Sequence, residues 1–307
     1  MTIAPPPAPK ALPPKPAGKP SLPKASPAPK TAARAPKTFV SAAWSGHGEG
    51  EKIVLYGASG MGKTTLASMA PRPVFIGVDD GARKIRDPRD DSVLNAIMGV
   101  ETFDDVREAI HQKNLYDDYE TLVIDTITKV EELSEPYIFE HYKVDGKTVH
   151  TLEGYGWGKG YRHALEVMRL ILQDCGALVK LGKNVILIAQ ENAVKMPNAE
   201  GLDYIQAGPK LFHTSQASSR LEVQEWADHV LRIGYAETNV AGAGAAATKG
   251  KITSRSTTRH IFTKEARHFF AKSRTIREPV ISFSTNEEGV PNDDALWQFL
   301  FPNQETK

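Results

Sequence analysis

The stretch Lys52-Ile53-Val54-Leu55-Tyr56-Gly57-Ala58-Ser59-Gly60-Met61-Gly62-Lys63-Thr64-Thr65 decides how the rest of this chain folds. Its apolar residues 53–56 predict a short buried strand, and the residues 66–70 that follow it predict a helix. The intervening spacing G-x-x-x-x-G-K-T, in this strand–loop–helix context, is a Walker A phosphate-binding loop. A plain Gly-rich turn is the alternative. It is disfavoured because the strand, the three glycines, the Lys-Thr pair and the helix all stand at the spacing of the motif.

Each residue type in this loop has a chemical role at its position. The glycines permit turns that direct successive backbone N–H groups at phosphates, and the helix start adds its positive dipole end. Lys63 offers a positive charge to the β- and γ-phosphates, and Thr64 offers a hydroxyl to Mg²⁺. We therefore predict ATP and Mg²⁺ as cofactors, with nucleotide contacts from Gly57, Ala58, Ser59, Gly60, Met61, Gly62, Lys63, Thr64 and Thr65.

Three further predicted strands end in polar residues, at the edge where ligands bind in open α/β sheets. The strand 119–126 carries Asp125 at its carboxyl end, and we interpret Asp125 as the Walker B ligand of Mg²⁺. The strand 184–190 ends in Gln190, a candidate γ-phosphate sensor, and is followed by a long predicted loop from Glu191 to Pro209. The strand 73–78 leads into Asp79-Asp80-Gly81, where a carboxylate could activate water, although an Asp-Gly turn fits equally well.

The remaining segments predict an ordinary α/β arrangement. Helices are expected over 101–116, 128–142, 161–181, 221–226 and 292–299, strands over 228–235 and 280–283, and a flexible Gly/Ala-rich loop over 241–251. Cys175, the single cysteine, belongs to the apolar side of its helix and is expected in the core. Trp157 and Tyr161, in a Gly- and Lys-rich segment, are expected to pack inward at a helix start; offering stacking faces to bases is the alternative.

The first 48 residues differ from the rest of the chain in composition. They hold twelve of the 21 prolines, seven basic residues and no acidic residue, which predicts a disordered tail. Because the whole chain carries a net charge of +1, the remaining residues carry −6. We therefore divide the chain into a tail, 1–48, and one P-loop domain, 49–307. Net charge alone gives the domain no affinity for nucleic acid, so any such affinity must come from the tail or from local basic patches. The tail is a DNA-binding arm or, at least as well, a solvating linker without a partner.

No stretch predicts a targeting signal, and none approaches the roughly 18 apolar residues of a membrane span. We therefore expect a cytoplasmic protein. The nine histidines are scattered and predict no zinc site. A basic cluster near the end contains Lys272 and Arg274; it is either a solvated hairpin or a source of cations that reach a neighbouring subunit's γ-phosphate.

The chain resembles the RecA-like ATPases, and more narrowly the phage nucleotide-binding proteins of the AAA_24 type, RecA-like single-strand annealing proteins of phage recombination. The resemblance runs from about Lys52 to Phe283. It rests on residues 56–64, Asp79-Asp80-Gly81, Val123-Ile124-Asp125-Thr126, Ile188-Ala189-Gln190 and Ala271-Lys272-Ser273-Arg274. It implies a RecA-like P-loop core with a mostly parallel sheet flanked by helices, assembling into a homo-oligomeric ring or filament. Asp80 stands where the family carries Glu, and this shorter side chain implies slow hydrolysis.

From these observations we expect an ATPase of the bacterial host cytoplasm that binds single-stranded DNA and promotes annealing or strand exchange, with a single-strand-binding or other recombination protein as a possible partner. Lys63, Asp80, Asp125 and Gln190 are the expected catalytic residues, Thr64 and Asp125 the metal ligands, and Lys272 or Arg274 the in-trans finger. The alternatives are a nucleotide-gated regulatory module that hydrolyses little and recruits partners through its proline-rich tail, and a helicase or packaging motor.

Overall fold

The computed structural model describes residues 41, 48–78, 80–198, 201–237 and 255–302, without the side chains of 80, 236, 237 and 255–257. The predicted disordered tail (apart from Ser41 and Gly48) and the predicted loop over 241–251 lie outside these residues. The elements, in chain order, are β1 (Lys52–Gly57), α1 (Lys63–Ser68), β2 (Pro73–Gly77), η1 (Asp80–Lys84), β3 (Ala96–Ile97), α2 (Phe103–His111), β4 (Thr121–Asp125), α3 (Ile127–His141), η2 (Glu153–Tyr155), α4 (Lys159–Lys180), β5 (Asn184–Met196), β6 (Tyr204–Pro209), α5 (Ser219–Trp226), β7 (His229–Glu237), β8 (Arg255–Phe262), β9 (Lys272–Ser273), β10 (Val280–Phe283) and α6 (Ala295–Leu300).

One mostly parallel sheet organises the folded part of the chain. Its strand order is β10-β8-β7-β1-β5-β4-β2-β3, with β6 paired to β5 and β9 paired to β7. The strands from β7 to β3 run parallel, and β8 runs antiparallel to both of its neighbours, β7 and β10. Consequently β1, β2 and β4 end at the edge where β5 carries Gln190, which is where the predicted polar residues were expected to meet.

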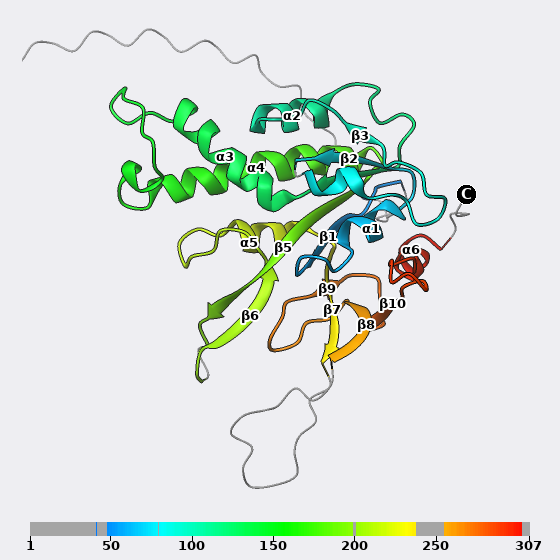
Figure 1. Ribbon diagram of the computed structural model, residues 1–307. Helices are drawn as coiled ribbons and strands as arrows, with labels where there is room; N and C mark the ends of the chain where they lie inside the picture. The colour runs from blue at the N-terminus through cyan, green and yellow to red at the C-terminus, as the bar shows by residue number, and fades with distance from the viewer. Residues whose placement is uncertain (1–40, 42–47, 79, 199–200, 238–254, 303–307) are drawn as a thin grey trace, which may run out of the picture. The chain divides into compact units, whose positions relative to one another are not determined.

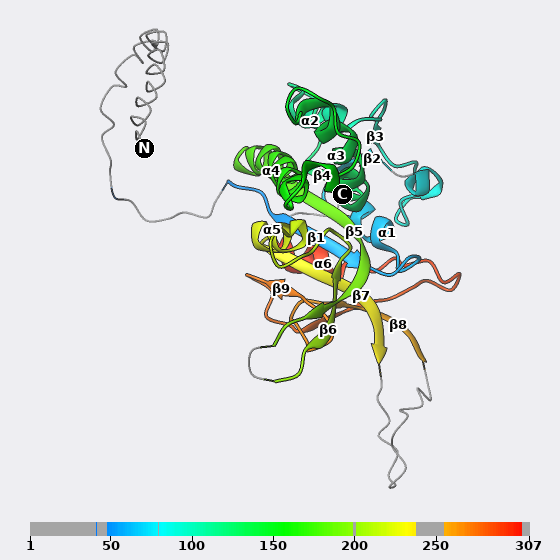
Figure 2. The same ribbon diagram turned by 90° about the vertical axis from the view of Figure 1, so that its left-hand side faces the viewer.

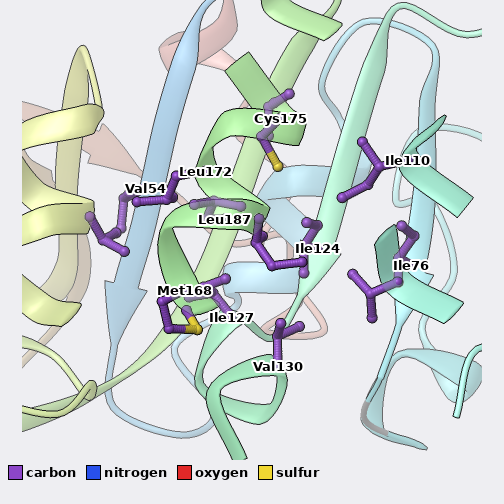
Figure 3. Packing of buried hydrophobic residues seen from close by; sticks show 14 of the residues in the cluster. Val54, Ile76, Ile110, Ile124, Ile127, Val130, Met168, Leu172, Cys175 and Leu187 are labelled. Atoms are coloured by element: carbon purple, nitrogen blue, oxygen red, sulfur yellow. The ribbon is translucent and has the colours of Figure 1, made fainter. Parts of the chain in front are cut away.

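The central strands are apolar on both faces because each face is covered. Val54 and Tyr56 of β1 face a core shared with α2, α3, α4 and α5, whereas Ile53 and Leu55 face a core shared with α1, β10 and α6. Figures 1 and 2 both show α2, α3 and α4 gathered on one side of β5, with β8 and β9 on the other. Cys175 lies inside the first core, as predicted, beside the residues labelled in Figure 3.

The predicted α/β class, with a mostly parallel sheet flanked by helices, is confirmed. A parallel sheet needs helical crossovers on its faces, and the alternation of apolar strands with amphipathic helices in the sequence supplies them. Thr102 caps α2 through a reciprocal capping box with Asp105, which explains why this helix begins at Phe103.

Two predictions are wrong. The long loop predicted over 191–209 is instead a β-hairpin, because β5 continues to Met196 and pairs antiparallel with β6. Its polar and apolar residues do not alternate strictly, and none of residues 191–196 is buried, so the segment lacks the sequence pattern of a strand while keeping the hydrogen bonding of one. Trp157, expected to pack inward, is 99% exposed, and only Tyr161 finds an aromatic partner, stacking on Phe212.

Candidate functional site

The predicted phosphate-binding loop lies between β1 and α1, as its sequence indicates. Gly57 is required because a Cβ there would lie 2.4 Å from the carbonyl oxygen of Ile233 in the neighbouring strand. Gly62 is required because it caps α1 with a φ of 85°, a left-handed conformation that favours glycine. Met61 differs from its neighbours, since its side chain belongs to the core instead of facing the site.

Lys63 is held over the loop by backbone carbonyls. Its Nζ donates to the carbonyl oxygens of Gly57 at 2.8 Å and Ala58 at 2.9 Å. Burial lowers the pKa of this ammonium from its usual value, while the carboxylates of Asp125 and Glu191 oppose the shift. The ammonium is therefore positioned at the loop with weakened hydration, which suits binding of a phosphate anion.

Thr64 and Asp125 meet although they are 61 residues apart in sequence. The Thr64 hydroxyl donates to Asp125 Oδ2 at 2.7 Å. Asp125 ends β4 and is 5% exposed, and Thr126 after it caps α3 by accepting from the Lys129 N–H. A hydroxyl and a carboxylate oxygen are hard ligands, so this pair fits Mg²⁺, which uses few protein ligands beside its waters.

Gln190 lies level with Gly57, its partner in the register between β5 and β1. Its side-chain Oε1 accepts from Lys210 Nζ at 3.2 Å, and its backbone N–H donates to the Thr128 hydroxyl at 3.2 Å. The hydroxyl of Thr128 in turn donates to the carbonyl oxygen of Lys210. Gln190 thus joins the start of α3 to the base of the β5–β6 hairpin.

These residues surround one cavity with a volume of ≈ 460 Å³. Its lining comprises Ser59, Gly60, Gly62, Lys63, Thr64, Thr65, Gly81, Ala82, Ile85, Asp125, Thr126, Gln190, Arg259, Gly289, Val290 and Pro291. The segment η1, which begins at Asp80, therefore faces the cavity, while Asp79 and the side chain of Asp80 lie outside the described residues. The volume is within the range of about 300–1,000 Å³ typical of small-molecule sites.

Several cavity residues were not predicted from the sequence. Arg259 comes from β8, and Gly289, Val290 and Pro291 come from a turn after β10, more than 190 residues beyond the loop they face. Glu191 is a further unpredicted neighbour, and its carboxylate accepts from Arg232 Nε at 2.7 Å. No local motif marks any of these positions, since only the long-range pairing of strands brings them to the site.

Lys272 and Arg274 lie at the opposite edge of the sheet from this cavity. In β9, Lys272 pairs with Val230 at the start of β7, where the parallel strands begin. Arg274 Nε lies 3.0 Å from Asp228 Oδ1, and the Arg274 side chain is 66% exposed. Within one chain, therefore, neither residue belongs to the phosphate site.

The part of the chain that the structure describes contains neither a cluster of three or more His, Cys, Asp or Glu side chains able to hold a metal ion nor a helix long and apolar enough to span a membrane. At the cavity, the Thr64 hydroxyl and an Asp125 carboxylate oxygen lie close enough together to hold a metal ion jointly with non-protein ligands.

Comparison with known proteins gives one family match. Residues 49–275 match the model of the AAA_24 family, described as an AAA domain. Among solved structures, a KaiC-like protein from Pyrococcus horikoshii is similar, with 14% identity, 79% of this chain and 88% of that chain covered, and a TM-score of 0.41. The RadB recombinase is similar with 13% identity, coverages of 76% and 90%, and a TM-score of 0.39. No curated protein gives a significant match.

Proposed function

The chain belongs to the AAA_24 family of AAA domains, and from this premise we propose that it is an ATPase that binds single-stranded DNA and promotes annealing or strand exchange in recombination or repair. The observation that carries the proposal is the convergence of Lys63, Thr64, Asp125 and Gln190 on one cavity. A phosphate loop, a metal-ligand pair and a polar sensor at the same edge are what nucleotide hydrolysis requires.

Nucleotide binding is the part of the proposal with the strongest structural support. The backbone of residues 57–65 and the Lys63 ammonium would hold the phosphates, and Thr64 and Asp125 would hold Mg²⁺. When bound, Mg²⁺ neutralises charge on the β- and γ-phosphate oxygens. The 2.7 Å Thr64–Asp125 hydrogen bond supports this assignment, because it holds the two oxygens next to each other at the residue that follows Lys63.

Hydrolysis needs a base and a sensor, and both are proposed from neighbouring strands. Asp80 would orient or deprotonate the attacking water, and its short side chain would make the reaction slow. Gln190 would respond to the γ-phosphate by exchanging its hydrogen bond from Lys210 for one to phosphate. Since Gln190 lies on the strand that becomes the β5–β6 hairpin, this exchange would change the hairpin's anchoring.

Single-stranded DNA is the proposed partner of this hairpin and its surroundings, which extend away from α2–α4 in Figure 1. An exposed aromatic face for base stacking is available at Trp157, which lies just before α4 and is 99% exposed, and on the hairpin the Arg267 guanidinium lies over the Tyr204 ring, 6.0 Å from its centroid, where it adds a cation. We further propose a ring or filament of identical subunits, phage origin with action in the host cytoplasm, and cooperation with a single-strand-binding or other recombination protein.

Fluorescence anisotropy of labelled oligo-dT tests the proposal, with wild type and Lys63→Ala compared with and without ATP and Mg²⁺ at several salt concentrations. We expect affinity that requires ATP, rises as salt falls because phosphate contacts release counterions, and is lost in Lys63→Ala. A variant lacking residues 1–48 separates the tail from the domain. Absence of DNA binding at low salt, in protein shown to bind ATP, would reject the DNA part.

The second candidate is a nucleotide-gated module that recruits a protein partner through the proline-rich tail. The net charge of −6 over residues 49–307 favours it, because this charge opposes non-specific binding of DNA. In the same experiment this candidate predicts ATP binding without DNA affinity in the tail-deleted protein.

A further inference from the structure

Three of the four residues that form one wall of the phosphate cavity come from a part of the chain that the family match does not include. The match ends at residue 275, whereas Gly289, Val290 and Pro291 line the cavity together with Arg259 of β8. We call these four residues the nucleoside wall. None of them is a phosphate or metal ligand in the proposed function.

The nucleoside wall touches the phosphate loop directly at Gly62. A Cβ at Gly62 would lie 2.8 Å from Pro291 Cγ and 3.4 Å from Arg259 Nη1. The wall therefore lies beside the point where the loop enters α1, and it lines the same cavity as Lys63 and Thr64.

The turn that carries the wall is built in advance of any ligand. Asn286 Oδ1 accepts from the Val290 N–H at 2.9 Å, the Asn286 N–H donates to the Val290 carbonyl at 2.8 Å, and Thr285 pairs antiparallel with Pro291. Asp293 ties the turn to β10 by accepting from the Ser282 hydroxyl at 2.8 Å. These hydrogen bonds hold Val290 at the cavity although its side chain is 39% exposed.

The helix that follows fastens the wall to the phosphate loop's own helix. Trp297 of α6 is 2% exposed, and its indole Nε1 donates to the Leu66 carbonyl of α1 at 2.9 Å. Phe283, at the end of β10, is fully buried in the same core. The segment that carries Gly289–Pro291 is therefore fastened to α1 at both of its ends, which favours a preorganised binding surface.

The chemistry of the wall fits a nucleoside. Val290 and Pro291 offer apolar contact to the face of a base, and the Arg259 guanidinium offers a planar fork of donors to base or ribose acceptors. We propose that Arg259 and Gly289–Pro291 form the subsite for the ribose and base of the nucleotide whose phosphates the loop binds. The inference rests on the proposed nucleotide binding at the P-loop.

Calorimetric titration of the full chain with ATP and with inorganic tripolyphosphate, both in Mg²⁺, tests the subsite. The variants are Arg259→Lys, which keeps the charge but loses the planar fork, and Val290→Ala, which removes apolar contact. The matched controls are Arg277→Lys and Val144→Ala, exposed residues outside the cavity. Thermal unfolding of each variant shows that the fold is retained.

We expect each wall variant to lower the affinity for ATP about three- to tenfold, as loss of one charged hydrogen bond or apolar contact does. The affinity for tripolyphosphate should change less than about twofold. The controls should leave both affinities unchanged. If the affinities for ATP and tripolyphosphate fall equally, or if both variants keep the wild-type affinity for ATP, the proposed subsite is wrong, while nucleotide binding at the P-loop is unaffected. If wild type binds neither ligand, the proposed function itself is wrong and the subsite falls with it.

Discussion

Thr64 and Asp125 show what a single pair of residues contributes to the site. Their hydrogen bond joins α1 to the end of β4 and holds the Thr64 hydroxyl oxygen next to a carboxylate oxygen of Asp125. Both residues could be predicted from the sequence, because each belongs to a local motif with a fixed position relative to a strand. Arg259 could not, since no local pattern connects a residue on an antiparallel strand to a loop almost 200 residues earlier.

The role of the Thr64 hydroxyl can be tested with a matched pair of variants. Thr64→Val keeps the shape and removes the hydroxyl, and it should lower Mg²⁺-dependent ATP hydrolysis by about 10–100-fold, the range seen when support for a bound metal is lost. Thr64→Ser keeps the hydroxyl and should retain most activity. Steady-state phosphate release measured against Mg²⁺ concentration distinguishes them; equal rates for the Val and Ser variants would exclude Thr64 as a ligand.

At the scale of elements, β1, β2, β4, β5 and β7 were predictable because their apolar runs have the length of buried parallel strands. The outer half of β5 was not, because a solvated hairpin is held by backbone hydrogen bonds that leave no hydrophobic signal. The turn over 285–291 was missed for a similar reason: its Asn286–Val290 hydrogen bonds are local, but its place at the cavity depends on β10 pairing with β8.

The packing of α3 against the segment before α5 leads to a prediction about pH. Glu131 of α3 accepts from the Phe212 backbone N–H at 2.9 Å. Burial raises the pKa of its carboxyl, and the Phe212 N–H opposes this shift. Because the pKa of Glu131 is raised in the folded state, its protonated carboxyl favours folding. This contribution to the free energy of unfolding is fully present below the unfolded pKa of about 4.3 and is lost as pH rises through the folded pKa.

Glu131→Gln should therefore stabilise the protein increasingly as pH rises, because glutamine keeps an acceptor for Phe212 without a buried charge. We expect the melting temperature to rise by about 2–4 °C at pH 8 and by less near pH 5. Glu132→Gln is the control: its side chain is 56% exposed and pairs at the surface with Lys129, so it should change the melting temperature by at most about 1 °C. A Glu131→Gln effect that is equal at both pH values would contradict the assigned pKa shift.

At the scale of the whole molecule, the length of the strands separates the phosphate loop from Lys272 of β9 and from Arg274, which follows β9. β1 runs from Lys52 to Gly57, and Ser273 of β9 pairs with His229, whose parallel partner is Ile53. At ~3.3 Å per residue, the start of β1 and the loop are roughly 13–16 Å apart. A phosphate contact from Arg274 is therefore excluded within one chain, and its proposed role requires a neighbouring subunit arranged head to tail.

Mixing two inactive variants tests this arrangement. Lys63→Ala lacks a working loop but keeps Arg274, and Arg274→Ala lacks the finger but keeps the loop, so each alone should hydrolyse little ATP. In assemblies formed from an equal mixture, roughly a quarter of head-to-tail interfaces would combine an intact loop with an intact finger, and activity should return to about that share of wild type. Phosphate release measured beside light scattering, which reports assembly, gives the answer. Because Arg274 must leave Asp228 to reach a neighbour, Asp228→Asn should not lower the activity of mixtures. If the mixture assembles but is no more active than its components, Arg274 is not the in-trans cation, and another residue must supply it.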